Sequence, residues 1–277
     1  MAGDRLPSFD LVVATVGRVD ELEALLDSLE HQTHHDFRVV LVDQNGDGRV
    51  GALVDGRGFD VVRLAAERGL SRARNAALPH LDADVIAFPD DDCVYPDDLL
   101  ERVALRLAAE PALDGVTGRA VDAAGGSSPS WKPDRALLTR DNLWNRAISF
   151  SVFLRRALVE QVGPFDESLG LGAGTAWSSG EEIDYLVRAL DAGARIEYDP
   201  ELAVVHPQET RPLQAVGARD GASIGYLLRK HRYPLRTVAP MLVRPAGATA
   251  LSLLRNDTAR ARFHAATLRG RLRGYLR

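Results

Sequence analysis

Short apolar runs alternate with amphipathic segments through the first half of the chain. The runs are rich in branched residues and cover residues 9–14, 37–42, 60–64 and 84–88. Leucines at helical spacing follow the first run, at positions 22, 25, 26 and 29. Because parallel strands need a crossover that is usually a helix, this alternation predicts an α/β fold with a mostly parallel, twisted sheet flanked by helices.

Polar residues stand at the ends of these runs. Thr15 follows the first run, Asp43 the second and Asp90 the fourth. In open parallel sheets, ligands bind beyond the carboxyl ends of the strands. We therefore expect these three residues to lie on the rim of one pocket.

The second half of the chain is less regular. Strand patterns cover 116–121, 148–154, 195–198 and 202–205, and helical patterns cover 155–162 and 181–192. Residues 163–180 are rich in glycine and predict a mobile loop with a functional role. Beyond Pro212 we expect helices to the end, broken at Pro234, Pro240 and Pro245.

Composition limits the class of protein. The 277 residues are 45% hydrophobic and 26% charged, which is typical of a globular protein and excludes a disordered chain. The single cysteine, Cys93, cannot form an internal disulfide and fits a reducing compartment. With no secretory signal pattern and no run of eighteen apolar residues, we expect no membrane-spanning helix and a cytoplasmic location.

Charge is distributed unevenly. From Arg229 onward there are twelve Lys and Arg residues and one acid, Asp257, so this region has a net charge of +11. Because the whole chain has a net charge of −5, the preceding part has a net charge of −16. Such an acidic part is a poor nucleic-acid binder. We expect a domain at 1–210 and a helical extension at 211–277 that is basic from about 229. The extension either binds the anionic inner face of the cell membrane, packs on the acidic domain or forms a homodimer contact.

Three consecutive carboxylates, Asp90, Asp91 and Asp92, follow the fourth strand. Adjacent carboxylates repel one another unless a cation or solvent compensates them. Oxygen ligands of this kind suit Mg²⁺ or Mn²⁺, which commonly bridge carboxylates to phosphates. The alternative is an acidic turn before the next helix, and the position at a strand end favours the metal.

Other residues offer complementary chemistry. Arg72 and Arg74 begin a predicted helix, where cations oppose the helix dipole, so either an anionic ligand or a solvated helix face explains them. Glu181, Glu182 and Asp184 open another helix, as dipole-favoured acids or as a general base beside a flexible loop. His206 follows an apolar strand and is either structural or a metal ligand.

Together these residues make the chain resemble glycosyltransferase family 2, the inverting nucleotide-sugar transferases with a GT-A fold. The resemblance extends from about Phe9 to His206. It rests on seven segments in order: 14–18, 41–45, 68–75, 88–92, 153–156, 162–167 and 180–184.

The resemblance implies a donor site. Asp43 recognises the nucleotide base with Thr15 beside it, and Arg18 belongs to the same group of nucleotide-sugar contacts. The Asp90–Asp92 segment matches the DxD motif: Asp90 contacts ribose or metal, Asp91 lies between, and Asp92 ligates the Mn²⁺ or Mg²⁺ that holds the diphosphate. His206 matches a histidine that sometimes completes the metal site.

It also implies a reaction. Glu182 stands where the family usually has the aspartate general base, with Glu181 as its neighbour and Asp184 in reserve. The base takes a proton from an acceptor hydroxyl, which displaces the diphosphate with inversion. Trp131 and Trp177 lie in loops expected to border a glycan or lipid-linked acceptor, and anchoring their own loops is their alternative role.

We expect an enzyme of cell-surface polysaccharide or glycoconjugate synthesis. One alternative is a catalytically silent nucleotide-sugar-binding or assembly protein with the same fold, which the retained acids disfavour. Another is a nucleotidyltransferase, but residues 16–20 make a poor phosphate loop after the first strand.

Overall fold

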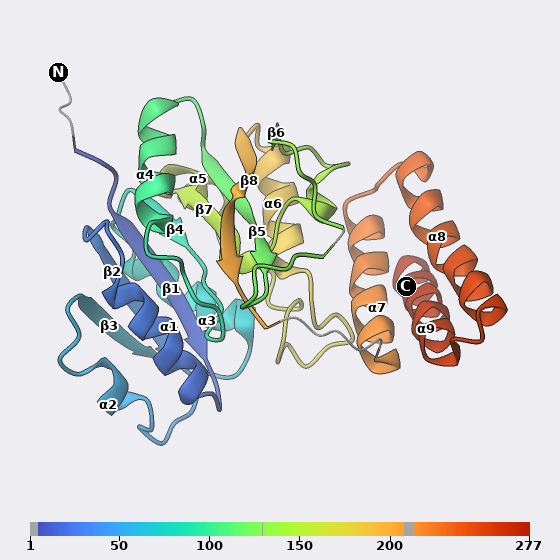
Figure 1. Cartoon of the computed structure of the whole chain (residues 1–277), viewed down its shortest axis with the longest axis horizontal. Coiled ribbons are helices and arrows are strands. Elements are labelled where there is room, and N and C mark those ends of the chain that lie inside the picture. Colours follow the sequence, from blue (N-terminus) through green and yellow to red (C-terminus); the bar gives the residue numbers. More distant parts are fainter. Residues whose placement is uncertain (1–4, 129, 208–212) are drawn as a thin grey trace. The chain divides into compact units, whose positions relative to one another are not determined.

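The computed structural model of the protein describes residues 5–128, 130–207 and 213–277 (Figure 1). Its strands are β1 (Phe9–Thr15), β2 (Phe37–Asp43), β3 (Asp60–Ala65), β4 (Val85–Ala87), β5 (Gly115–Val121), β6 (Ala136–Leu137), β7 (Val152–Arg155) and β8 (Ile196–Val205). Its α-helices are α1 (Asp20–Glu30), α2 (Gly51–Val54), α3 (Leu70–Ala77), α4 (Leu99–Ala109), α5 (Arg156–Val162), α6 (Glu181–Asp191), α7 (Gln214–Lys230), α8 (Leu235–Leu254) and α9 (Thr258–Leu276). Short 3₁₀ turns cover Leu78–His80, Leu143–Asn145 and Ser149–Ser151.

The strands of the described residues form one mixed sheet in the order β3-β2-β1-β4-β7-β5-β8-β6. Strands β1 to β4 pair in parallel, as do β5 and β8, whereas β7 runs antiparallel between β4 and β5. Helices flank the sheet (Figure 1). The α/β fold with a mostly parallel sheet, expected from the alternation of apolar runs, is confirmed.

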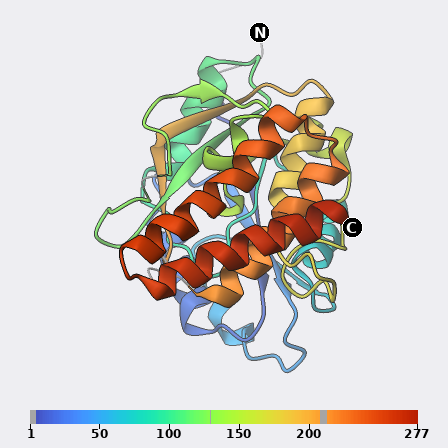
Figure 2. The same ribbon diagram turned by 90° about the vertical axis from the view of Figure 1, so that its right-hand side faces the viewer.

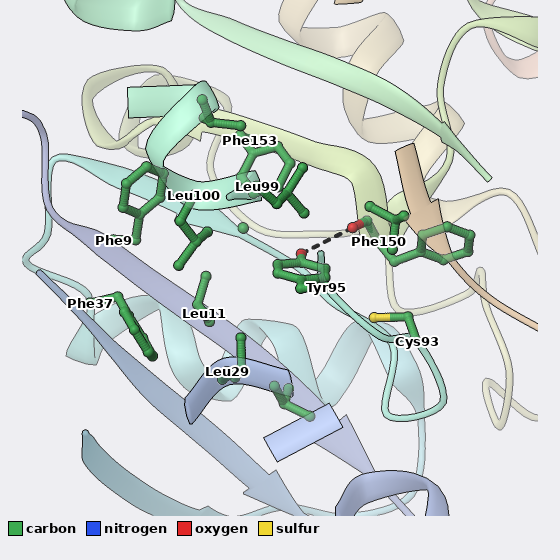
Figure 3. Close-up of a cluster of buried hydrophobic side chains, with 14 of the residues drawn as sticks. Phe9, Leu11, Leu29, Phe37, Cys93, Tyr95, Leu99, Leu100, Phe150 and Phe153 are labelled. Carbon is green, nitrogen blue, oxygen red and sulfur yellow. Dashed lines mark hydrogen bonds between the residues drawn. The ribbon is translucent and has the colours of Figure 1, made fainter. Parts of the chain in front are cut away.

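The core lies between the sheet and the helices that cover it. Residues of β1 are buried almost without interruption, which is typical of a parallel strand covered on both faces. Leucines of α1 pack against β1, and Tyr95 and Phe153 extend the same cluster (Figure 3). The Tyr95 hydroxyl donates a hydrogen bond to the carbonyl oxygen of Phe150, at 3.0 Å, so this buried polar group is satisfied.

The chain divides into two compact units. The first contains residues up to Arg68, Arg72–Phe165 and the chain from Tyr185 to the end of β8, and therefore the whole sheet. The second contains Gly69–Ser71, Asp166–Asp184 and the three C-terminal helices. Most of the glycine-rich segment thus groups with the C-terminal helices by its contacts, and the domain boundary near 210 stays a prediction.

The second unit is built on a close approach of α7 and α9, and α8 packs against α9 (Figure 2). A Cβ atom at Gly225 of α7 would lie 2.1 Å from the carbonyl oxygen of Arg271. One at Gly274 of α9 would lie 2.0 Å from the carbonyl oxygen of Ala222. Any larger residue at these two positions would force the helices apart, so glycine sets their spacing.

The expected breaks at Pro240 and Pro245 are wrong, because α8 runs through both prolines. Pro245 has no N–H to donate to the carbonyl of Met241, four residues earlier. A guanidinium N–H of Arg271, on α9, donates to that carbonyl instead. The neighbouring helix therefore replaces the lost bond, and the break falls at Asn256, which has a φ of 55°.

Within the described residues, α8 is long and apolar enough to cross a membrane, judged by length and composition only, and 17% of its apolar window is buried. The expectation of no membrane-spanning helix rested on uninterrupted apolar runs, and length and composition alone do not exclude one at α8. Two arginines and two prolines interrupt the run in α8 without removing its apolar character.

Candidate active site

The aspartate triplet lies at the carboxyl end of β4, in the interior of the sheet. Asp90 forms a bridge with Ala14 that continues the pairing of β4 with β1. Farther on, Val94 pairs with Val205 at the end of β8 through two backbone hydrogen bonds of 2.8 and 3.1 Å. This pairing brings His206 to the triplet.

Asp90, Asp92 and His206 form a group that suits a metal ion. One ligand atom from each lies within 4.8 Å of the others. Oδ1 of Asp92 is sealed from solvent and has no hydrogen-bond partner in the described chain, although Nε2 of His206 lies 3.1 Å away. In the neutral imidazole with its proton on Nδ1, Nε2 is a lone-pair donor to a metal, so a cation could join it to the Asp92 carboxylate. Carboxylate oxygens and an imidazole nitrogen are donors that Mn²⁺ accepts, and the residues therefore fit the metal.

Neighbouring side chains hold this group in place. The Phe150 ring stacks on the His206 ring, with centroids 4.5 Å apart and planes 7° apart, which fixes the imidazole. The Ser149 hydroxyl donates to Asp90 at 3.2 Å. Ser149 was missed from the sequence, since a single serine in a segment predicted as a strand carries no signal of a site. Its role follows from the 3₁₀ turn that precedes β7.

Arg18 provides the local positive charge. Its Nη1 lies 2.8 Å from Oδ1 of Asp91 and 2.6 Å from Oδ2 of Asp92. The Arg18 side chain is 44% exposed, whereas those of Asp91 and Asp92 are 9% and 13% exposed. An exposed arginine that closes over two shielded carboxylates is well placed to meet an anionic ligand arriving from solvent.

The pKa values of these groups follow from burial and charge. Burial raises the pKa of Asp91, against the opposing effects of Thr15 and Arg18. Burial acts in the same direction on Asp92, but contact with His206 and the charge of Arg18 lower its pKa overall. For His206, burial lowers the pKa, and contact with Asp92 and its charge raise it overall. The charged forms of Asp92 and His206 therefore stabilise each other.

Thr15 and Asp43 are register partners at the ends of β1 and β2. The structure thus brings these two predicted residues to one sheet edge. The Asp43 carboxylate accepts from the backbone and side-chain nitrogens of Asn45, both at 2.9 Å, and from Arg63 at 2.7 Å. Burial raises its pKa, and these bonds lower it overall. Asn45 and Arg63 were not predicted as partners of Asp43.

The two predicted arginines of α3 have different surroundings. Arg74 is 1% exposed, pairs with Asp90 at 3.2 Å and lies over the rings of Phe88 and Phe165. It therefore helps to position Asp90. Arg72 is half-buried, and its guanidinium donates to the carbonyl of Arg68 at 3.3 Å. Direct contact of either arginine with phosphate stays a prediction.

The predicted acids of α6 lie in its first turn, in the second compact unit. Glu181 is buried and Glu182 is half-buried. Asp184 is fully buried and pairs with Lys230 at 2.5 Å and with His231 at 2.8 Å. Because the side chains of Lys230 and His231 both hold Asp184, this residue anchors the start of α6 to the end of α7.

The two tryptophans proposed for an acceptor each stack on a tyrosine. Trp131 lies parallel to Tyr198, with centroids 6.4 Å apart, and packs against the core of the first unit. Trp177 lies parallel to Tyr226 of α7, with centroids 4.7 Å apart. Both rings therefore anchor their loops, and contact with an acceptor stays a prediction.

Solved structures with the same architecture define the class. The mannosyltransferase PcManGT from Pyrobaculum calidifontis, solved with GDP-Man and Mn²⁺, matches with a TM-score of 0.64 and 19% identity, over 96% of this chain and 87% of its own. TarS from S. aureus matches with a TM-score of 0.61 and 20% identity, over 81% of this chain and 43% of its own. The fold is thus that of the GT-A glycosyltransferases.

The profile of the family described as Glycosyl transferase family 2 matches residues 10–162, which is more than half of the chain. The protein therefore belongs to glycosyltransferase family 2, as the seven sequence segments had indicated.

Curated relatives agree with this membership. A pre-mycofactocin glycosyltransferase of Mycobacterium tuberculosis is 28% identical over 232 residues, which cover 77% of this chain and 44% of that protein. The succinoglycan biosynthesis protein ExoM of Rhizobium meliloti is 28% identical over 245 residues, which cover 82% and 77%. The chain thus spans less than half the length of the first of these relatives and most of the second.

Proposed function

We propose that this protein is a metal-dependent, inverting glycosyltransferase. It transfers a hexosyl or deoxyhexosyl group from a nucleotide-diphosphate-sugar to an acceptor hydroxyl in the synthesis of a cell-surface polysaccharide or glycoconjugate. The observation that carries the proposal is the group of Asp90, Asp92 and His206, in which a ligand atom from each residue lies within 4.8 Å of the others and Oδ1 of Asp92 is buried. Two relatives support the setting, since ExoM is named for succinoglycan biosynthesis and PcManGT was solved with GDP-Man and Mn²⁺.

Asp90, Asp92 and His206 would hold Mn²⁺ or Mg²⁺. The bound ion would supply positive charge beside the diphosphate and so stabilise the leaving group. Arg18 adds a second positive charge, since its guanidinium already spans Asp91 and Asp92. Asp43 and Thr15, at the ends of neighbouring strands, would receive the nucleoside.

Glu182 is our choice for the general base. Asp184 is held by Lys230 and His231, and Glu181 is buried, which leaves Glu182 as the half-buried acid of this turn. A carboxylate with access to solvent can accept the proton of an acceptor hydroxyl. The hydroxyl oxygen then bonds to the anomeric carbon as the bond to the diphosphate oxygen breaks, and the configuration inverts.

The test combines donor binding with donor turnover. Nucleoside diphosphates and their sugars are screened by thermal shift with and without Mn²⁺, and turnover of the best donor is then measured. We expect Asp92→Ala to lose the Mn²⁺-dependent shift, and Asp97→Asn, which changes an exposed acid nearby, to keep it. Equal donor binding in excess EDTA would contradict metal dependence.

The variant Glu182→Gln separates the enzyme from a silent nucleotide-sugar-binding or assembly protein of the same fold. For the enzyme, we expect this variant to bind the donor normally and to lose turnover by a factor of about 100 or more. Donor binding by the wild type with no turnover across a panel of sugar and lipid-linked acceptors would favour the silent protein. Unchanged turnover in Glu182→Gln would move the base to another residue.

We also propose that the protein acts in the cytoplasm, peripherally on the inner face of the cell membrane. Support comes from the twelve basic residues and one acid of the C-terminal region and from exposed apolar residues of α8 such as Leu235, Val243 and Leu254. Flotation of the full chain with anionic and with neutral vesicles tests this, and equal recovery in the two would contradict it. A homodimer stays a prediction.

A further inference from the structure

A cavity of about 470 Å³ opens between α7, α8 and α9, within the second unit. Its walls are apolar over much of their surface, with Ile224, Met241 and Phe263 among them. Three basic side chains also line it: Arg244, His264 and Arg271. Figure 2 shows the arrangement of these three helices.

Arg271 lines this cavity and has no charged partner among the residues that the structure describes. One of its terminal N–H groups donates to the carbonyl oxygen of Met241, which fixes the guanidinium. Its Nε atom is sealed from solvent and has no hydrogen-bond partner among the residues that the structure describes. No salt bridge joins Arg271 or Arg244 to an acid of the described chain. The one carboxylate of the lining, that of Asp220, lies 2.8 Å from Nε of Arg219.

This arrangement is costly for the protein by itself. A shielded charge is unfavourable unless an opposite charge or several hydrogen bonds compensate it. Burial lowers the pKa of Arg271, and the nearby charge of Arg244 lowers it further. Two arginines that line one cavity and pair with none of the described acids therefore indicate an anion that is supplied from outside.

The shape and chemistry of the cavity narrow the kind of anion. Guanidinium groups bind phosphate oxygens through paired N–H donors, and His264 offers another donor. The apolar wall would not contribute to the binding of an inorganic anion, but it can pack against a hydrocarbon chain. A second cavity of about 260 Å³ shares Ala248 and His264 with the first and extends the space along α8. Its charged lining residues are Arg255, Arg260 and Asp257.

We propose that the cavity between α7, α8 and α9 binds a phosphate group carried on an apolar chain. The phosphate lies against Arg271 and Arg244, and the chain lies along the apolar side chains of α8 and α9. The proposal is independent of the transferase reaction, since every residue in it belongs to the C-terminal helices. Failure of the metal site would leave it unaffected.

The test uses the full chain and isothermal titration calorimetry with three probes. Farnesyl monophosphate has both the phosphate and the chain, farnesol has the chain alone and inorganic phosphate has the anion alone. We expect farnesyl monophosphate to bind about tenfold or more tightly than either of the others. Sedimentation with phosphatidylcholine vesicles, with and without phosphatidic acid, shows whether a bilayer lipid also supplies the phosphate.

Three variants locate the binding. Arg271→Gln and Arg244→Gln should each weaken farnesyl monophosphate binding by about tenfold or more. Arg269→Gln changes an exposed arginine of α9 outside the cavity and should bind as the wild type does. Arg244 is itself exposed, so Arg244→Gln remains informative if Arg271→Gln fails to fold.

The outcomes separate clearly. The site is supported if binding of farnesyl monophosphate, or of phosphatidic acid vesicles alone, depends on Arg271 or Arg244. The probe that binds then identifies the source of the phosphate group. Three variants that bind equally would overturn it, as would a wild type that binds neither the soluble probe nor the vesicles. Inorganic phosphate that binds as tightly as farnesyl monophosphate would overturn the role of the chain.

Discussion

Nε2 of His206 lies 3.1 Å from Oδ1 of Asp92, although the two residues are far apart in the sequence. The sheet produces this contact, because Val94 and Val205 pair directly beside them. The candidate metal site therefore depends on the backbone pairing of the loop after β4 with the end of β8.

The first prediction concerns the ligands themselves. Asp92→Asn and His206→Ala should each lower Mn²⁺ affinity by about 100-fold or more, since even residues that only support metal ligands are worth 10- to 100-fold. Titration of Mn²⁺ in the presence of UDP or GDP, followed by electron paramagnetic resonance, measures the effect. Asp97→Asn is the control and should bind Mn²⁺ as the wild type does. Retained affinity in both site variants would place the metal elsewhere.

The second prediction distinguishes the role of Arg18 from that of the metal-ligand residues. Its guanidinium contacts Asp91 and Asp92, so it competes with a cation for their charge. Arg18→Gln should therefore bind Mn²⁺ alone as tightly as the wild type or several-fold more tightly, while nucleoside diphosphates bind about tenfold more weakly. The same resonance titration, with and without nucleotide, gives both affinities. A loss of Mn²⁺ binding alone would mean that Arg18 orders the carboxylates instead.

Much of the first unit was predictable because its signals are local. The apolar runs of β1 and β2 are buried on both faces of the sheet, and the leucines of α1 repeat at helical spacing. The rule for strand ends then placed Thr15, Asp43 and Asp90 on one edge. His206 was noted at the end of an apolar strand, with a structural and a metal-ligand role both open, and the family resemblance implied the second. The pairing of Val94 with Val205 explains its position.

What could not be predicted depends on distant partners. The run at 148–154 gave one strand, but its first half is a 3₁₀ turn that presents Ser149 to Asp90. The strand at β8 continues through Pro200, where two strands were expected. The helix α8 continues through Pro245 because Arg271, on another helix, bonds the carbonyl that the proline leaves free. The residues close to Pro245 in the sequence do not predict the hydrogen bond from Arg271.

The third prediction concerns Lys230, whose amino group lies 2.6 Å from Asp166 and 2.5 Å from the fully buried Asp184. Lys230→Met should lower the free energy of unfolding by about 3 kcal/mol at neutral pH, because it removes one partner of a buried charge. Lys132→Met changes the other lysine, which is exposed, and should have no effect. Thermal melting of the three proteins measures the difference.

The pH dependence of that difference is a sharper test. Burial raises the pKa of Asp166, but the hydrogen bonds from Lys230 and Ser168 bring it below the ordinary 3.8. When folding lowers the pKa of a carboxyl group, the resulting stabilisation is fully present at a pH above the pKa of the unfolded state. It is lost as the pH falls through the pKa of the folded state. The gap between wild type and Lys230→Met should therefore be steady at pH 5–8 and narrow below about pH 4. A gap that stays constant down to pH 2 would rule out an electrostatic origin.

The last prediction concerns the spacing of α7 and α9. A Cβ at Gly225 would lie 2.1 Å from the carbonyl oxygen of Arg271, whereas one at Gly247 of α8 would meet nothing within 4 Å. Gly225→Ala should cost about 1–3 kcal/mol or more, because backbone must move to admit the methyl group. Gly247→Ala should instead gain up to about 1 kcal/mol of helix propensity. Differential scanning calorimetry should show that the two substitutions shift the melting temperature in opposite directions, by about 2–4 °C per kcal/mol. Equal shifts would mean that the two helices are not in the close contact described above, because the same substitution would then meet the same surroundings at both sites.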